Sequence, residues 1–130
     1  MLDSIGGTVF LDFASLWEEV ADAVPQRDAI VQGERRISYR NFDDAAARFA
    51  AAIEAVGVNE NDKVALYLFN CPEYLIAQHG AFKHRAVPIN VNYRYLDDEL
   101  VYLLDNSDSQ EMCIRDSTGG ARVRTFNGSQ

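Results

Sequence analysis

Cysteine and proline are scarce in this chain, which has two cysteines and three prolines among 130 residues. Cys71 and Cys113 form no CxxC pair, so the sequence excludes a disulfide scaffold and indicates a reducing compartment. Positive charge is also scarce, because 12 Lys and Arg stand against 20 Asp and Glu. The net charge of −8 argues against binding to nucleic acid or to an anionic membrane surface.

The sequence also lacks long apolar runs and internal repeats. No run approaches the length of a transmembrane helix, and the first nine residues lack the features of a signal peptide. We therefore expect a cytoplasmic protein without a transmembrane segment. Hydrophobic residues make up 48% of the chain, which is enough for one globular domain.

Hydrophobic spacing predicts two amphipathic helices in the first half. Residues 13–24 carry apolar side chains at helical spacing. Ser38 suits the N-cap of a second helix, and Gly57 is placed to end it in a left-handed conformation. Between the helices, residues 29–32 and 36–39 read as strands joined by a hairpin or a longer loop. The apolar stripe of the second helix is interpreted as core rather than as a cofactor site: Phe42, Ala45, Ala46, Phe49, Ile53 and Val56.

The second half alternates strands and helices. Residues 64–69 form a continuous apolar run, typical of a strand that is buried on both faces of a parallel sheet. A helix from Pro72 to about residue 84, a strand over 86–89 and a helix over 97–105 follow. This order predicts an α/β fold with a mostly parallel sheet, flanking helices and right-handed crossovers. Another buried strand should come after residue 107, but the sequence there is polar.

No residue pattern predicts a catalytic or metal site. His79 and His84 would lie about 140° apart on a helix, so they cannot share a metal ion. His79 stands among apolar residues and is interpreted as a packed or polar-edge side chain rather than a catalytic one. Cys71 precedes a helix N-terminus, where a thiolate is favoured, but no partner acid or base accompanies it and we interpret it as a small buried side chain.

The acidic clusters and the glycine pair are likewise not interpreted as ligand-binding sites. Asp97, Asp98 and Glu99 are expected to be solvated residues that complement the dipole of a helix, and Asp43-Asp44 is interpreted in the same way. Gly6-Gly7 lacks the context of a nucleotide-binding loop and indicates only a flexible arm. We therefore assign no catalytic, cofactor-binding or metal-binding residue from the sequence.

Five short segments and a block after them follow one another in a recognisable order: Phe13-Ala14-Ser15-Leu16, Ile37-Ser38-Tyr39, residues 57–65, Asn70-Cys71-Pro72-Glu73-Tyr74, residues 87–95, and Asp98-Glu99-Leu100 with Leu103-Leu104 and Asp108. By this order, residues 13–109 resemble the N-terminal part of the adenylate-forming acyl-CoA synthetases, the AMP-binding superfamily. The resemblance implies the opening portion of an adenylating domain, from an enzyme that joins a fatty or other carboxylic acid to CoA through an acyl-adenylate.

In that family a Thr/Ser/Gly-rich loop ending in lysine holds the ATP phosphates, and it lies downstream of the part present here. Residues 118–122, Thr-Gly-Gly-Ala-Arg, only superficially resemble it because they contain no lysine. The resemblance implies ATP, Mg and CoA for the complete enzyme, whose missing C-terminal remainder would be the partner of this chain. We expect the chain alone to be inactive and to expose apolar surface. The alternative is a small self-contained α/β binding or interaction domain without catalysis.

Residues 111–117 resemble translated DNA rather than a protein motif. Met112-Cys113-Ile114-Arg115-Asp116-Ser117 is what ATG TGT ATA AGA GAC AG encodes, the transposon end used in sequencing adapters. The charge balance changes here too, since residues 111–130 carry one net positive charge and leave nine net negative charges on residues 1–110. A natural strand over 112–114 is the alternative. We therefore expect a flexible arm over 1–12, a partial AMP-binding domain over 13–109 and a non-native, disordered tail over 110–130.

Overall fold

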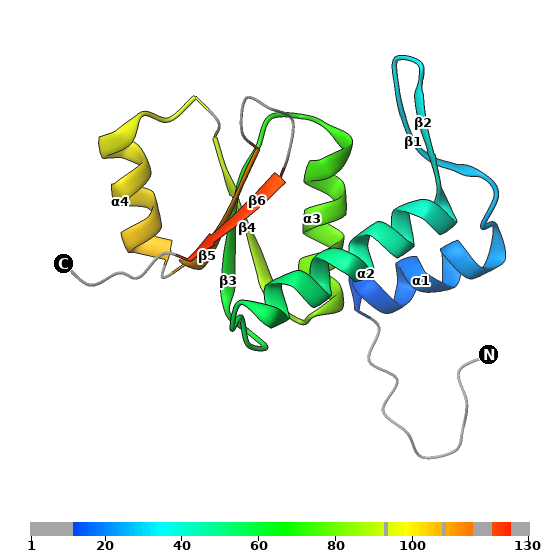
Figure 1. The fold of residues 1–130 in the computed structure, drawn as a ribbon, viewed down its shortest axis with the longest axis horizontal. Coiled ribbons are helices and arrows are strands. Elements are labelled where there is room, and N and C mark those ends of the chain that lie inside the picture. The colour runs from blue at the N-terminus through cyan, green and yellow to red at the C-terminus, as the bar shows by residue number, and fades with distance from the viewer. Residues whose placement is uncertain (1–11, 93, 108, 116–120, 126–130) are drawn as a thin grey trace.

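The structure is a computed structural model that describes residues 12–92, 94–107, 109–115 and 121–125 (Figure 1). Except for Asp12, the predicted N-terminal arm lies outside these residues. The elements, in chain order, are α1 (Phe13–Ala23), β1 (Asp28–Gln32), β2 (Arg35–Ser38), α2 (Tyr39–Ala55), β3 (Lys63–Tyr67), α3 (Pro72–Lys83), β4 (Val87–Val91), α4 (Asp97–Ser107), β5 (Ser109–Arg115) and β6 (Ala121–Thr125).

Local signals at the helix ends explain the first part of the fold. Asp12 caps α1 by accepting a hydrogen bond of 2.8 Å from the Ser15 amide. The antiparallel pairing of β1 with β2 confirms the hairpin, with Gly33 in its turn at a φ of +60°. Ser38 caps α2 through a 3.2 Å bond from the Asn41 amide, and Gly57 follows that helix with a φ of +96°.

Helix α2 turns its predicted stripe to the core. Phe42, Ala46 and Ile53 are buried, and Ala45 and Phe49 are partly buried. Val56, at the C-cap position, is the exposed member of the stripe.

The sheet has the strand order β4-β3-β5-β6. Strand β3 pairs in parallel with β4 and with β5, whereas β6 runs antiparallel to β5. The step from β3 to β4 and the step from β4 back past β3 to β5 run in opposite directions. Right-handed crossovers therefore place α3 and α4 on opposite faces of the sheet, as Figure 1 shows.

Strand β3 is buried on both faces, as its apolar run predicted. Val64 and Leu66 face a core that includes Ile53 of α2 and Ala77 of α3. Ala65, between them, points to the other face and belongs to a smaller core with Val91 and Leu104. The alternation of side chains along a strand thus divides one apolar run between two cores.

Helices α2 and α3 cross at very short range. A Cβ built on Gly80 of α3 would lie 2.7 Å from the carbonyl oxygen of Ala46 and 2.6 Å from Cδ1 of Phe49. The small alanine side chains of α2 thus allow α3 to approach it closely at Gly80.

The expectation of a disordered tail is wrong for the residues that the structure describes there. Strand β5 covers most of the adapter-like segment and lies between β3 and β6, and both neighbours pair with its backbone. Its backbone is paired on both edges, although Arg115 stands where the sequence analysis looks for apolar continuation. Residues 116–120 and 126–130 lie outside the described residues.

Candidate functional site

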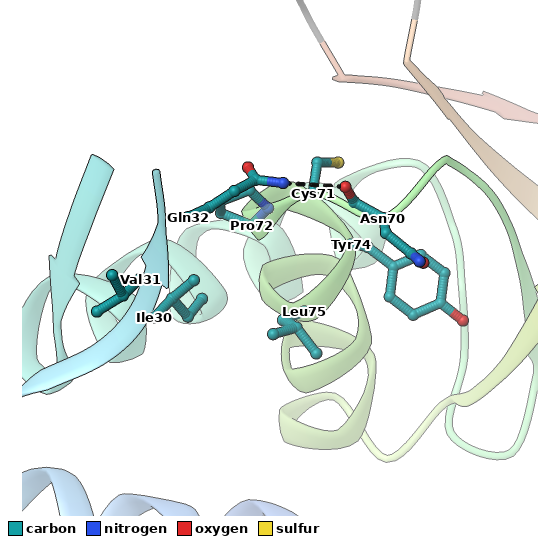
Figure 2. Close-up of a pocket in the computed structure, with 8 residues that line it drawn as sticks. All are labelled: Ile30, Val31, Gln32, Asn70, Cys71, Pro72, Tyr74 and Leu75. Atoms are coloured by element: carbon teal, nitrogen blue, oxygen red, sulfur yellow. Dashed lines mark hydrogen bonds between the residues drawn. The ribbon is translucent and has the colours of Figure 1, made fainter. Parts of the chain in front are cut away.

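The carboxyl end of β3 opens into a groove of about 380 Å³ between the β1–β2 hairpin and the first turn of α3. This is the edge at which open α/β sheets generally bind ligands. In Figure 2, Ile30 and Leu75 lie on opposite sides of the groove, and Gln32 reaches across its end toward Asn70. Eight residues line it: Ile30, Val31, Gln32, Asn70, Cys71, Pro72, Tyr74 and Leu75.

Two polar contacts fasten the hairpin to this edge. The Gln32 amide donates a 3.2 Å hydrogen bond from Nε2 to the Asn70 carbonyl. An ion pair of 2.7 Å joins Arg35 of β2 to Glu73 in the first turn of α3. The groove is therefore held by contacts between residues about 40 positions apart, which local sequence patterns do not reveal.

The lining of the groove carries no charge, so it supplies no cation for a phosphate group. Cys71 is buried at the N-cap position of α3 and makes no side-chain capping bond, which agrees with its interpretation as a small buried residue. Burial raises the pKa of Tyr74, so its phenol stays protonated at neutral pH. The lining therefore offers mainly apolar contacts.

His79 is packed among rings, as predicted. Its ring centroid lies 4.7 Å from that of Trp17, 4.9 Å from that of Phe42 and 5.9 Å from that of Phe82. Nδ1 is 3.0 Å from the Leu75 carbonyl, which makes it the donor in the neutral tautomer. Burial lowers the pKa of His79, and the nearby Lys83 adds to this, so the imidazole is neutral at pH 7.

His84 has a separate environment. Its Nε2 is 2.6 Å from the carbonyl oxygen of Val58, in the connection that leads to β3. The two histidines therefore contact different parts of the fold. Among the described residues, no group of three or more His, Cys, Asp or Glu side chains is arranged to hold a metal ion.

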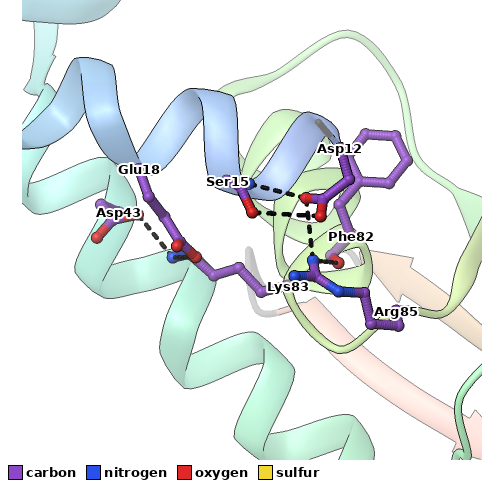
Figure 3. Close-up of polar contacts among 7 residues, drawn as sticks. All are labelled: Asp12, Ser15, Glu18, Asp43, Phe82, Lys83 and Arg85. Carbon is purple, nitrogen blue, oxygen red and sulfur yellow. Dashed lines mark hydrogen bonds and ion pairs between the residues drawn. The ribbon is translucent and has the colours of Figure 1, made fainter. Parts of the chain in front are cut away.

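Lys83 joins three helices through two ion pairs (Figure 3). Its Nζ lies 2.7 Å from Oε1 of Glu18 on α1 and 2.7 Å from Oδ1 of Asp43 on α2, and its own side chain is 14% exposed. Burial alone would lower the pKa of Lys83, but the bonds to Asp43 and Glu18 outweigh it and raise the pKa above its usual value. The interpretation of Asp43 as a solvated residue is therefore wrong.

A second contact lies at the start of α1. Arg85 Nη1 is 3.2 Å from Oδ1 of Asp12 and 3.1 Å from the carbonyl oxygen of Phe82. The Ser15 amide bond, with the help of Arg85, lowers the pKa of the Asp12 carboxyl. Both contacts in Figure 3 hold α1 against the rest of the fold and bring no reactive groups together.

On α4, Asp98 and Glu99 are exposed, as expected for solvated residues. Glu99 also accepts a 3.3 Å hydrogen bond at Oε2 from the Leu96 amide, just before the helix. They line a second groove of about 420 Å³ together with Tyr95, Tyr102 and Leu103.

The chain is similar in sequence to a known family of enzymes. Residues 17–126 match the family of AMP-binding enzymes. The chain belongs to the AMP-binding enzyme family. The match covers most of the 13–109 resemblance and extends across the adapter-like segment.

The curated relatives of this AMP-binding chain are acyl-CoA ligases. It is 44% identical over 100 residues to the medium/long-chain-fatty-acid–CoA/3-oxocholest-4-en-26-oate–CoA ligase of Mycobacterium tuberculosis, which covers 77% of the chain and 18% of that ligase. It is 42% identical over 98 residues to the 3-oxocholest-4-en-26-oate–CoA ligase of Rhodococcus rhodochrous, covering 75% and 18%. The chain thus spans about a fifth of the length of these relatives.

Two of the solved structures with the same fold are N-terminal parts of larger proteins. The N-terminal domain of FACL13 from Mycobacterium tuberculosis matches with a TM-score of 0.73 and 28% identity, over 76% of this chain and 25% of that one. The N-terminal subdomain of NpsA from Klebsiella oxytoca, at 23% identity, shares the fold with a TM-score of 0.76 over 82% of this chain and 27% of that one.

Within the part of the chain that the structure describes, every helix is too short or too polar to be a membrane span.

Proposed function

We propose that this chain is the opening portion of an ATP-dependent acyl-CoA ligase that acts through an acyl-adenylate, and that it does not catalyse the reaction alone. The observation that carries the proposal is the family match combined with the length of the relatives, about four fifths of which has no counterpart in these residues. A self-contained binding domain is less well supported, because the curated relatives are ligases.

The groove at the end of β3 is consistent with a chain that does not catalyse adenylation alone. Adenylation creates negative charge on the ATP phosphates, and enzymes stabilise it with cations and backbone donors. The groove lining has no charged residue, and Arg35 beside it is paired with Glu73. The two described lysines lie elsewhere, since Lys83 is held by two carboxylates and Lys63 starts β3. Residues 118–120, the glycine-bearing stretch, lie outside the described residues, so their exclusion as a phosphate loop stays a prediction.

For the complete enzyme we propose ATP, Mg and CoA as the cofactors and co-substrates and a fatty or other carboxylic acid as the substrate. The relatives are ligases of medium- and long-chain fatty acids and of 3-oxocholest-4-en-26-oate, which supports an apolar acid as the substrate. No residue of this chain is assigned to the binding of any of them. The cytoplasmic location expected from the sequence also stays a prediction.

The proposal is tested by reading the source DNA beyond codon 110 and expressing the longer reading frame. We expect an in-frame Gly-rich segment ending in lysine, and a longer protein that forms acyl-hydroxamate from ATP, hydroxylamine and a medium-chain acid. A natural stop codon after residue 130, with no adapter bases at codons 111–117, would contradict it. The same DNA decides whether residues 111–117 are non-native.

A further inference from the structure

The groove at the carboxyl end of β3 leaves apolar side chains exposed on both of its walls. Val31 of the hairpin is 53% exposed and Leu75 of α3 is 39% exposed, and Ile30 lies opposite Leu75 (Figure 2). The volume of about 380 Å³ falls in the range of about 300–1,000 Å³ that is typical of small-molecule sites, which are mostly apolar with a few polar groups. The middle of the groove is therefore suited to a hydrocarbon chain.

The polar groups of the groove are gathered at one end. Gln32 and Asn70 meet there through their 3.2 Å hydrogen bond. Arg35 is the partner of Gln32 in the antiparallel pairing of β1 with β2, and directly opposite residues of such a pair place their side chains on the same face. Arg35 therefore lies on the groove side of the hairpin, where its 2.7 Å ion pair reaches Glu73 of α3.

Arg35 has the capacity to pair with a second carboxylate. A guanidinium carries five N–H donors in a planar fork, and the ion pair with Glu73 engages Nη1. The Arg35 side chain is 48% exposed, so a ligand can reach it from solvent. One shared arginine suits a single carboxylate, whereas adenylation of ATP needs several cations and donors around the phosphates.

The local charge of the hairpin also favours an anionic head group. Residues 27–40 contain four arginines and two acidic residues, whereas residues 1–110 as a whole carry nine net negative charges. An anion is therefore attracted to the hairpin and repelled by the rest of the chain. This difference in charge favours the Arg35 end of the groove for an acidic group.

We propose that this groove binds an apolar carboxylate, such as a medium-chain fatty acid, with the carboxylate beside Arg35 and the hydrocarbon chain between Ile30 and Leu75. Binding at this site requires neither ATP nor the length of the related ligases that this chain lacks. The choice of an apolar acid rests on the proposed function, because the relatives are ligases of such acids. The position of the site rests on the geometry and charge of the hairpin and α3 alone.

Calorimetric titration of the 130-residue chain with decanoate, without ATP and below the micellar concentration, tests the proposal. We expect saturable binding of one decanoate per chain. Decanol, which has the same hydrocarbon chain and no charge, should bind about tenfold more weakly, because hydrogen bonds to charged groups contribute about 1.5–3 kcal/mol each. The absence of saturable decanoate binding, or equally tight binding of decanol, would overturn the proposal.

Three variants test the two ends of the groove separately. Arg35→Gln should lower the affinity for decanoate to about that for decanol and leave the affinity for decanol unchanged. Leu75→Asp should weaken the binding of both compounds by at least about tenfold. Leu16→Asp, a matched control at a 54% exposed site of α1 outside the groove lining, should change neither affinity. Circular dichroism at 222 nm reports whether each variant folds.

The variants also separate this site from non-specific uptake of fatty acid. Equal losses of affinity in Leu75→Asp and Leu16→Asp, or an unchanged decanoate affinity in folded Arg35→Gln, would place the fatty acid elsewhere and overturn the proposal. A chain that binds no decanoate, but whose source DNA continues in frame to a Gly-rich segment ending in lysine, would contradict this site and leave the proposed function standing.

Discussion

The crossing of α2 and α3 makes Gly80 a position at which the addition of one methyl group should destabilise the fold. In Gly80→Ala the new methyl group would lie 2.6 Å from Cδ1 and 2.8 Å from Cβ of Phe49, and 2.7 Å from the Ala46 carbonyl oxygen. The Phe49 ring can rotate, but the carbonyl oxygen belongs to a helix backbone and cannot move alone. The two helices must therefore separate.

The expected loss of stability follows from two opposing effects. Overpacking of a core costs about 1–3 kcal/mol, and a contact with backbone favours the upper end of that range. Alanine is about 1 kcal/mol better than glycine inside a helix. The net loss is about 2 kcal/mol, which corresponds to roughly 8 °C in the unfolding midpoint of a domain of this size.

Thermal unfolding followed by circular dichroism at 222 nm measures this shift. Arg48→Ala, at an exposed position of α2, is the control for substitution on a helix surface and should change the stability by less than about 0.5 kcal/mol. An unchanged or higher midpoint for Gly80→Ala would refute the close crossing of the two helices.

Three further predictions concern the helix contacts. Lys83→Met should destabilise the chain by about 1–3 kcal/mol in urea unfolding at pH 7, because it leaves Glu18 and Asp43 without their cation. Since the pKa of Lys83 is raised in the folded state, the difference between wild type and variant should shrink as the pH rises above about 10.5; a constant difference would be contrary to the assigned pairs. The pKa of His79 is lowered, so below about pH 6.5 the unfolded chain takes up a proton that the folded chain does not, and stability should fall on acidification; His79→Phe should flatten this fall, and an unaltered slope would contradict the packing of the ring. Ser38→Ala should cost about 1 kcal/mol in urea unfolding through the loss of the α2 cap, whereas Ser38→Asp should retain most of the stability, and equal losses in both would argue against capping.

The elements with local signals could be predicted from the sequence. Ser38 and Gly57 delimit α2 because a capping hydroxyl and a left-handed glycine act within a few residues of their own backbone. The apolar run over 64–69 predicts β3 because a strand buried on both faces leaves no polar position.

Contacts between distant residues could not be predicted in this way. Asp43 and Lys83 are 40 positions apart, and only the packing of α2 against α3 brings them together. The groove depends similarly on the contact of Gln32 with Asn70. The alternation of strands and helices calls for a strand after residue 107, and a strand over 112–114 is the alternative interpretation of the sequence there; β5 agrees with that alternative. Its bounds could not be predicted, because its pairing with β3 and β6 leaves no pattern in the sequence of residues 109–115.

The release of pyrophosphate by the purified 130-residue chain tests the central claim most directly. The chain would be incubated with ATP, Mg and medium- and long-chain fatty acids, beside the Mycobacterium tuberculosis ligase as the active control. We predict no release above a blank without protein, because about four fifths of the length of the related ligases has no counterpart in this chain and the lining of the groove at the end of β3 carries no charge. Release that depends on both ATP and the acid, and that persists after removal of contaminating ligases, would contradict the claim.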